Sequence, residues 1–206
     1  METSIIKGIQ SVKSAFFDAF FESISFLGEE LVYILIFSIA YWCLNKRESI
    51  KLILIFLVSG IVNNSLKELI NRERPIGVEG VESLREQTAT GQSMPSGHTQ
   101  LATTFYYYLI YTFKKRWITI TASILIALVA LSRVYLGVHW PSDVIVAIIL
   151  GILIVHIGLI IYTNASRKVL LITLGISNLL MIPFFSEDLL VTVSIITGAI
   201  IGIILE

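Results

Sequence analysis

The chain has 206 residues, of which 55% are hydrophobic and 15% are charged, and its formal net charge is zero. Soluble domains carry roughly 25% charged residues, so this composition is typical of an integral membrane protein. A chain without excess positive charge has no general attraction for nucleic acid, and no nucleic-acid partner is expected. The single cysteine, Cys43, excludes an intrachain disulfide.

The N-terminal stretch, residues 4–27, reads SIIKGIQSVKSAFFDAFFESISFL. Phe16, Phe20 and Ile24 recur every four residues, whereas charged side chains interrupt any continuous apolar run. This pattern predicts an amphipathic helix that lies in the membrane interface, with a distorted first span as the alternative. We therefore expect residues 1–28 to form an interfacial segment. No cleavable signal peptide is expected, because a basic start followed by an unbroken apolar core is missing.

Long apolar runs bounded by charges follow, and about 20 such residues are needed to cross a bilayer. We predict spans near residues 29–45, 50–70, 98–113, 117–136, 143–163, 168–185 and 188–205. The predicted fold class is all-α: a polytopic membrane helical bundle of about six to seven transmembrane helices plus the N-terminal amphipathic helix. Residues 29–165 would form the core, with a long loop at 71–97, and residues 166–206 would add further C-terminal membrane helices.

Short basic loops indicate the orientation of the spans. These loops contain Lys46, Arg47 and Lys51; Lys114, Lys115 and Arg116; and Arg167 and Lys168. If the spans alternate, the three loops share one side, which the positive-inside rule makes cytoplasmic. The outer side then receives the loop at 71–97 and the segment 132–143, which hold the most unusual polar residues.

The loop at 71–97 is preceded and opened by basic residues in the sequence KELINRERP. Lys67 ends the second predicted span, and Arg74 follows seven residues later, just before Pro75. Seven residues are nearly two helical turns, so both cations would point the same way on a continuing helix. Taken alone, the pair is equally compatible with Lys and Arg side chains that reach toward water from a helix end.

The segment MPSGHTQ, residues 94–100, opens the third predicted span. A Pro-Ser-Gly turn before a helix presents free backbone N–H groups and so favours an anion. Ser96 can add a hydroxyl or serve as the N-cap, and Gly97 lets the backbone approach a ligand closely. His98 can donate a proton near neutral pH. An ordinary N-cap with an incidental histidine is the alternative.

The third cluster is SRVYLGVHWPSD, residues 132–143, between two predicted spans. A charge at membrane depth costs at least ~2.5 kcal/mol, so charged residues there are candidates for function. Asp143 lies four residues after His139, where a carboxylate can fix the tautomer of the ring and make its other nitrogen a better nucleophile or base. A metal site is the competing explanation, but Lys67, Arg74 and Arg133 would repel a divalent cation.

Together the clusters supply the parts needed to transfer a phosphoryl group through a histidine, with no metal or other cofactor. The cations and the helix N-terminus would hold phosphate oxygens. His139 would attack phosphorus and form a phosphohistidine, with Asp143 supporting the positive charge on the ring. His98 would protonate the departing oxygen and then help water to attack.

These residues resemble the three-part signature of the type 2 phosphatidate phosphatase superfamily: Lys-x6-Arg-Pro, Pro-Ser-Gly-His and Ser-Arg-x5-His-x3-Asp. That family includes membrane lipid phosphate phosphatases, bacterial undecaprenyl-pyrophosphate phosphatases and soluble vanadium haloperoxidases. The matching positions are Lys67, Arg74 and Pro75; Pro95, Ser96, Gly97 and His98; and Ser132, Arg133, His139 and Asp143. By position, the resemblance implies phosphate binding by Lys67, Arg74, Ser96, Gly97 and Arg133, with His98 as the acid, His139 as the nucleophile and Asp143 as its partner.

We therefore expect a metal-independent lipid phosphatase that hydrolyses a lipid phosphate or pyrophosphate headgroup at the outer surface of a bacterial cell membrane. Its partners would be the lipid substrate and the bilayer. A membrane transporter or receptor that binds a phosphorylated lipid in the same basic pocket without hydrolysis is the alternative. A haloperoxidase is disfavoured because that branch of the family is soluble.

Overall fold

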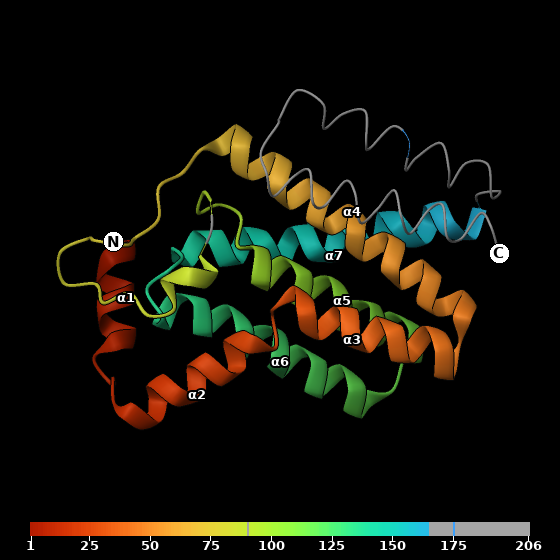
Figure 1. Cartoon of the computed structure of the whole chain (residues 1–206), viewed down its shortest axis with the longest axis horizontal. Helices are drawn as coiled ribbons and strands as arrows, with labels where there is room; N and C mark the ends of the chain where they lie inside the picture. The colour runs from red at the N-terminus through yellow and green to blue at the C-terminus, as the bar shows by residue number, and fades with distance from the viewer. Residues whose placement is uncertain (90, 165–174, 176–206) are drawn as a thin grey trace.

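The computed structural model describes residues 1–89, 91–164 and 175, and within these ranges it contains helices and no strand (Figure 1). The elements are α1 (Glu2–Gln10), α2 (Ala15–Phe26), α3 (Glu30–Ile39), the π-helical turn η1 (Ala40–Leu44), α4 (Lys46–Ile70), the 3-10 turn η2 (Glu86–Thr88), α5 (Gly97–Phe113), α6 (Arg116–Tyr135) and α7 (Pro141–Asn164). The all-α prediction is confirmed for this part of the chain.

The predicted spans up to residue 163 coincide with helices to within about one turn at each end. Among the described residues, α4, α6 and α7 are each long and apolar enough to cross a membrane. The pair formed by α2 and the continuous α3–η1 segment, bent by 50°, adds a fourth if it is one span. The shorter α5, with 17 residues, lies within the bundle and packs against α4, α6 and α7. The spans predicted at 168–185 and 188–205 lie outside the described residues.

The N-terminal segment differs from its prediction. A single amphipathic helix over residues 4–27 is wrong, because α1 ends at Gln10 and α2 begins only at Ala15. Ser14 starts the second helix: its hydroxyl accepts a hydrogen bond from the backbone N–H of Phe17 at 3.4 Å, as an N-cap does. The apolar periodicity was therefore a property of α2, and the preceding residues form a separate helix.

Both N-terminal helices pack against one end of the bundle, at the left of Figure 1. Ile6 of α1 is completely buried and clusters with Val81 and Val134. Phe21 of α2 lies against Tyr135, with ring centroids 4.3 Å apart. These contacts hold α1 and α2 over the ends of α6 and α7 and the loop at 71–97.

Buried polar side chains join α4 to α5 inside the bundle. The Nδ2 of Asn63 donates to Oε1 of Gln100 at 2.9 Å, and Nε2 of Gln100 donates to the carbonyl of Ser59 at 2.9 Å. One turn further along, the hydroxyls of Ser59 and Thr104 are 2.9 Å apart. Such side chains find partners on a neighbouring helix because lipid offers none, and they fix how α4 and α5 align.

The loop at 71–97 lies across the same end of the bundle as the N-terminal helices. The backbone N–H of Leu84 donates to the carbonyl of Leu136 at 2.9 Å, just before the turn at Gly137. Gly137 has a φ of 67°, and a Cβ there would collide with the carbonyl of Glu82. Only glycine fits this position without strain, so the close approach of the loop depends on it.

The basic turns lie at the opposite end of the bundle. Lys46 is at the start of α4, and Lys114–Arg116 lie at the turn between α5 and α6. Both places are far from the loop at 71–97 (Figure 1). The predicted separation of basic turns from the polar loop is therefore present in the fold. The third basic pair, Arg167 and Lys168, lies outside the described residues.

Gly151 of α7 provides a test of this packing. A Cβ at Gly151 would lie 2.8 Å from the Cβ of Thr103 and 3.0 Å from the carbonyl oxygen of Gln100 on α5. We predict that Gly151→Ala lowers the stability of the detergent-solubilised protein by about 1–3 kcal/mol, because the added methyl group overpacks this contact. The measurement is the thermal unfolding midpoint.

Gly60→Ala is the matched control, since nothing lies within 4 Å of the Cβ position at Gly60 of α4. Its unfolding midpoint should equal or slightly exceed that of the wild type. If both variants unfold at the same temperature, the close contact between α5 and α7 at Gly151 is not needed for stability, and the prediction is wrong.

Candidate active site

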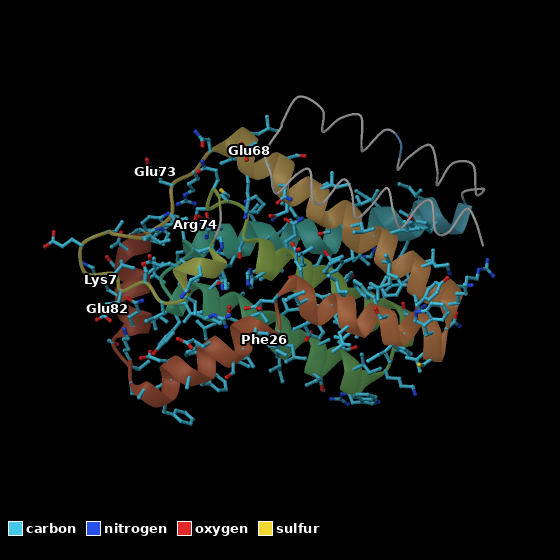
Figure 2. The ribbon with its side chains drawn as sticks, viewed as in Figure 1. Lys7, Phe26, Glu68, Glu73, Arg74 and Glu82 are labelled. Carbon is cyan, nitrogen blue, oxygen red and sulfur yellow. The ribbon has the colours of Figure 1, made fainter. Side chains whose placement is uncertain are left out.

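The ends of α4, α5, α6 and α7 meet under the loop at 71–97, and the residues expected to do chemistry gather there. One cavity is lined by Lys67, Arg74, Gly97, His98 and His139, while Ser96, Arg133 and Asp143 are completely buried in the surrounding protein. Figure 2 shows Arg74 on the loop above the helix ends. A Cβ on Gly97 would lie 3.9 Å from Nζ of Lys67, so this cation is beside the start of α5.

The nucleophile predicted from the sequence, His139, is 1% exposed and contacts a cation and a carboxylate through its two nitrogens. Nη1 of Arg74 lies 3.0 Å from Nε2 of His139. A guanidinium can only donate, so Nε2 accepts and the ring proton is on Nδ1. Nδ1 faces Oδ2 of Asp143 at 3.5 Å. In this tautomer the lone pair of Nε2, the nucleophilic nitrogen of a neutral imidazole, accepts the hydrogen bond from Arg74.

The carboxylate of Asp143 is surrounded by donors. Its Oδ2 accepts hydrogen bonds from the hydroxyl of Ser93 at 2.5 Å and from the backbone N–H of Trp140 at 2.8 Å. Its Oδ1 accepts from Nη1 of Arg72 at 2.8 Å. These donors hold the buried carboxylate in place against the ring of His139, where its oxygen can support a positive charge on the ring.

Burial and nearby cations set the charge states of the groups in the loops. Burial lowers the pKa of His139 well below its usual value, and Arg74, Arg133 and Lys67 add to the effect by repelling the protonated ring. Burial also lowers the pKa of Arg74 to about 10, although the carboxylate of Asp143 opposes this change. At neutral pH the imidazole is therefore neutral while the arginine beside it is charged.

Several buried nitrogen atoms have no hydrogen-bond partner among the described residues. Arg133 donates through Nη1 to the hydroxyl of Ser25 at 2.6 Å, but its Nε and Nη2 have no partner. Nε2 of His98 is likewise buried and unpartnered. Each such group costs ~1–3 kcal/mol in a folded protein, so their concentration at one place indicates a site built for an oxygen-rich anion.

The start of α5 adds backbone polarity to these cations. Ser96 occupies the N-cap position, but its hydroxyl donates to Oγ1 of Thr99 at 3.1 Å and makes no bond to the helix backbone. Gly97 follows, and a Cβ there would come within 3.3 Å of Oδ1 of Asn63. The positive end of the helix dipole thus lies beside Lys67, which favours an anion at this point.

The bend between α2 and α3 closes the site from the side of the N-terminal helices. A Cβ on Gly28, in this bend, would lie 3.0 Å from the Cβ of His98, so a larger residue would displace the histidine. Arg85 of the loop holds the bend through an ion pair with Glu29 at 2.5 Å and a hydrogen bond to the carbonyl of Glu22 at 3.1 Å.

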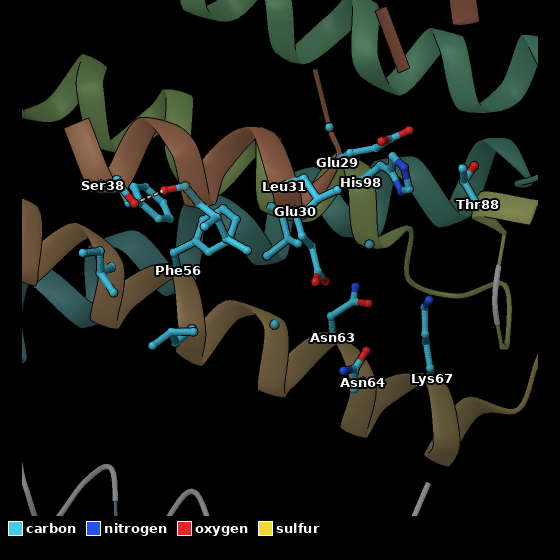
Figure 3. Close-up of a pocket in the computed structure, with 18 of the residues that line it drawn as sticks. Glu29, Glu30, Leu31, Ser38, Phe56, Asn63, Asn64, Lys67, Thr88 and His98 are labelled. Carbon is cyan, nitrogen blue, oxygen red and sulfur yellow. Dashed lines mark hydrogen bonds between the residues drawn. The ribbon is translucent and has the colours of Figure 1, made fainter. Parts of the chain in front are cut away.

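The cavity extends well beyond the residues predicted to be catalytic. It has a volume of about 670 Å³ and runs between α3 and α4, as Figure 3 shows. At the end nearest His98 its lining is polar, with Glu29, Glu30, Asn63, Asn64 and Lys67. Further along it is mainly apolar, with Leu31, Ile34, Phe37, Trp42, Ile53, Phe56 and Leu57. One continuous space therefore joins a polar region beside His98 to a hydrophobic groove.

Three residues that contact the predicted site were not expected from the sequence: Arg72, Ser93 and Ser25. Arg72 lies two residues before Arg74 in the same NRERP sequence, and the presence of a third cation there was the available signal. Nothing in the local sequence marks Ser25, which reaches Arg133 from a helix 108 residues away along the chain.

The fold and the site define a helical membrane protein with a cavity lined by histidines and cations at one end of its bundle. Residues 48–167, more than half of the chain, match the family described as the PAP2 superfamily. The chain belongs to the PAP2 superfamily, and the resemblance seen in the sequence is confirmed.

Similar proteins include two curated relatives and a solved structure. An undecaprenyl-diphosphatase of Sulfolobus acidocaldarius is 35% identical over 106 residues, which are 52% of this chain and 51% of the relative. A probable sphingosine-1-phosphate phosphatase of Dictyostelium discoideum is 32% identical over 165 residues, covering 73% of this chain and 40% of the relative. The crystal structure of Aquifex aeolicus LpxE aligns with a TM-score of 0.69 at 28% identity, covering 77% of this chain and 94% of that one. The match thus spans about half or less of each curated relative.

The lowered pKa of His139 leads to a prediction about pH. The neutral ring is the nucleophilic form, and the shift moves its protonation well below the usual value of 6.5. If the protein hydrolyses phosphate esters, as expected from the sequence, protonation of His139 should reduce kcat/KM only well below that pH. The profile is measured at acid and neutral pH, with the substrate's own titration followed by phosphorus NMR. A loss of activity near pH 6.5 that the substrate does not explain would contradict the prediction.

Proposed function

We propose that the protein is an integral membrane phosphatase that hydrolyses a lipid phosphate or pyrophosphate through a phosphohistidine intermediate. The observation that carries the proposal is the single cavity that joins His98, His139 and their cations to the apolar groove between α3 and α4. A phosphate headgroup suits the first part and a hydrocarbon chain suits the second. The curated relatives support the lipid assignment, since their names describe phosphatases of a prenyl diphosphate and of a sphingoid phosphate.

The first chemical step transfers the phosphoryl group to the protein. Nε2 of His139 attacks phosphorus, so that an N–P bond forms while the bond between phosphorus and the lipid oxygen breaks. His98 donates a proton to the departing oxygen. Asp143 faces the opposite nitrogen of the attacking ring at 3.5 Å, and its negative charge stabilises the positive charge that the ring gains.

The second step releases phosphate and restores the histidine. A water molecule attacks phosphorus and gives a proton to His98, which now acts as a base. The N–P bond breaks, its electron pair returns to Nε2 of His139, and inorganic phosphate is formed. His98 thus returns to its starting protonation state, and the cycle needs no external redox partner.

Stabilisation of the transition state comes from the fixed positive groups. Arg74 lies 3.0 Å from Nε2 of His139, which places its guanidinium against a phosphate that approaches this nitrogen. Arg133 has buried N–H groups available, and Lys67 lies beside the start of α5. Donors held in a site without bulk water stabilise developing charge strongly. The same cations would repel a divalent metal, so the proposed chemistry is metal-independent.

We also infer that the site faces the outer side of the membrane. The basic turns at the start of α4 and between α5 and α6 lie at the end of the bundle opposite the site, and such turns are retained on the cytoplasmic side. The substrate would then be a lipid whose headgroup lies in the outer leaflet.

The central test compares two histidines. His139→Ala should abolish phosphate release from a lipid phosphate by purified protein in the presence of a chelator, because the nucleophile is lost. His156→Ala is the matched control: His156 hydrogen-bonds to Tyr107 at 2.7 Å and does not line the cavity, so activity should remain. Quenched wild-type reactions should also contain an acid-labile phosphoprotein that His139→Ala lacks.

Each alternative has its own result in this assay. Wild-type activity in His139→Ala would disprove the assignment of the nucleophile. Tight binding of lipid phosphates without release of phosphate by any variant would favour a transporter or receptor.

The apolar groove leads to a separate prediction about substrate length. Ile34→Trp should narrow the groove and lower kcat/KM for a long-chain lipid phosphate about tenfold, because displacing two methylene groups loses ~1.6 kcal/mol. Hydrolysis of a short, water-soluble phosphate ester should change little. Ile124→Trp on α6, another exposed isoleucine that does not line the cavity, is the control. Equal losses for both substrates would show that the groove does not hold the chain.

A further inference from the structure

Arg72 joins the buried carboxylate of the site to the first helix of the chain. Its Nη1 donates to Oδ1 of Asp143 at 2.8 Å and to the hydroxyl of Ser142 at 2.5 Å. Its Nη2 forms an ion pair with Oε2 of Glu2, also at 2.5 Å. The guanidinium therefore lies between two carboxylates, one in the site and one on α1. Its planar shape lets the two terminal nitrogens bond to different carboxylates at the same time.

Glu2 completes the connection from the other side. Its Oε1 accepts hydrogen bonds from the backbone N–H of Ser142 at 3.0 Å and from the hydroxyl of Ser142 at 2.7 Å. Ser142 is in the first turn of α7, where backbone N–H groups have no partner within the helix. A carboxylate at this place stabilises the start of the helix. Through Glu2, α1 therefore fixes the position of the first turn of α7, which carries Asp143.

Trp140 limits the movement of Arg72. The guanidinium carbon lies 5.5 Å from the centre of the Trp140 ring, and the indole N–H donates to the carbonyl of Glu73 at 2.9 Å. The backbone N–H of the same tryptophan donates to Oδ2 of Asp143. The segment that carries His139 and the loop that carries Arg72 are thus locked together around one carboxylate.

We propose that Arg72, held by Glu2, is a positioning residue that keeps the carboxylate of Asp143 aimed at His139. This inference rests on the proposed function. Arg72 is not among the described residues that line the cavity, so it acts through Asp143 and not on the phosphate. The carboxylate of Asp143 accepts hydrogen bonds from Arg72, Ser93 and the backbone of Trp140. Removal of Arg72 takes away the positively charged donor and leaves the buried negative charge without its ion pair.

The charged groups that face Asp143 come from three parts of the chain. They are Arg72 and Arg74 of the loop at 71–97, His139 of the turn between α6 and α7, and Glu2 of α1 through its ion pair with Arg72. Without Arg72, the carboxylate keeps Ser93 and the backbone of Trp140 as donors but loses the cation that fixes Oδ1. The carboxylate can then turn away from Nδ1 of His139, so the chemical step should slow while substrate binding is unaffected.

The experiment measures kcat and KM on a lipid phosphate in mixed micelles. Arg72→Met should lower kcat about 100-fold, the effect of misplacing a catalytic group by ~1 Å, while KM changes little. Arg72→Lys should restore part of kcat, because it keeps the charge, but not all of it, because an ammonium cannot bridge two carboxylates as a planar guanidinium does. Glu2→Gln should give a smaller loss of kcat than Arg72→Met.

Lys13→Met is the matched control. Lys13, just before α2, forms an ion pair with Glu82 of the same loop but does not contact Asp143. Its kcat and KM should equal those of the wild type. Wild-type kcat in Arg72→Met, or the same loss in Lys13→Met, would overturn the inference.

A second measurement does not depend on hydrolysis. The unfolding midpoints of Arg72→Met, Asp143→Asn and the double variant should be non-additive, since the two side chains share one buried interaction. Additive midpoints would overturn the inference whatever the activity. If the wild type hydrolyses no lipid phosphate, the proposed function fails, while this cycle still decides whether Arg72 holds Asp143.

Discussion

The buried negative charge of Asp143 is the constraint on which this end of the molecule depends. A carboxylate removed from water must be surrounded by donors, and they come from three separate stretches of chain. Ser93 and Arg72 reach it from opposite ends of the loop at 71–97, and the backbone of Trp140 reaches it from the turn before α7. The loop therefore has to fold back over the helix ends, and by doing so it brings Arg74 against His139.

The surrounding positive charges have the opposite character. Arg133 is completely buried on α6 but uses only Nη1 for hydrogen bonds within the described residues. Arg74 is held by the carbonyls of Gly91 and Val138 at 2.9 and 2.8 Å, so its position does not depend on a bound anion. The negative charge is thus fully hydrogen-bonded within the protein, whereas Arg133 keeps buried N–H groups that have no partner in the described part of the chain. This difference is what the proposed phosphate site would need in order to be electrostatically preorganised.

Local sequence was sufficient for the parts of this site that lie within a few residues of each other. The four-residue spacing of His139 and Asp143 predicted that they would meet, and Nδ1 and Oδ2 are 3.5 Å apart. Hydropathy located α3 to α7 because a long apolar run has few other folds available in lipid. The segment at 132–143 was recognised as a candidate site for the same reason, since charges at membrane depth are rarely without a role.

The remaining features depend on contacts between distant segments, which spacing does not encode. The bridge from Glu2 to Arg72 joins residues 70 positions apart, and neither position has a local pattern that requires the other. The N-terminal segment forms two helices because Ser14 caps the second one. The regular spacing of apolar residues across the segment suggested one continuous helix and made this cap hard to recognise. The groove between α3 and α4 follows from how two helices pack, and residues such as Ile34 and Phe56 look like ordinary span residues in the sequence.

The direction of that groove has a consequence for how a lipid would meet the protein. From Glu30 to Trp42 the α3–η1 segment advances by roughly 18 Å at 1.5 Å per residue, close to the ~15 Å depth of hydrocarbon in one leaflet. A chain lying along it would stay at the depth it already occupies in the bilayer. Binding would then be lateral diffusion into a slot of matching height, and the hydrophobic part of the molecule would never have to be lifted into water.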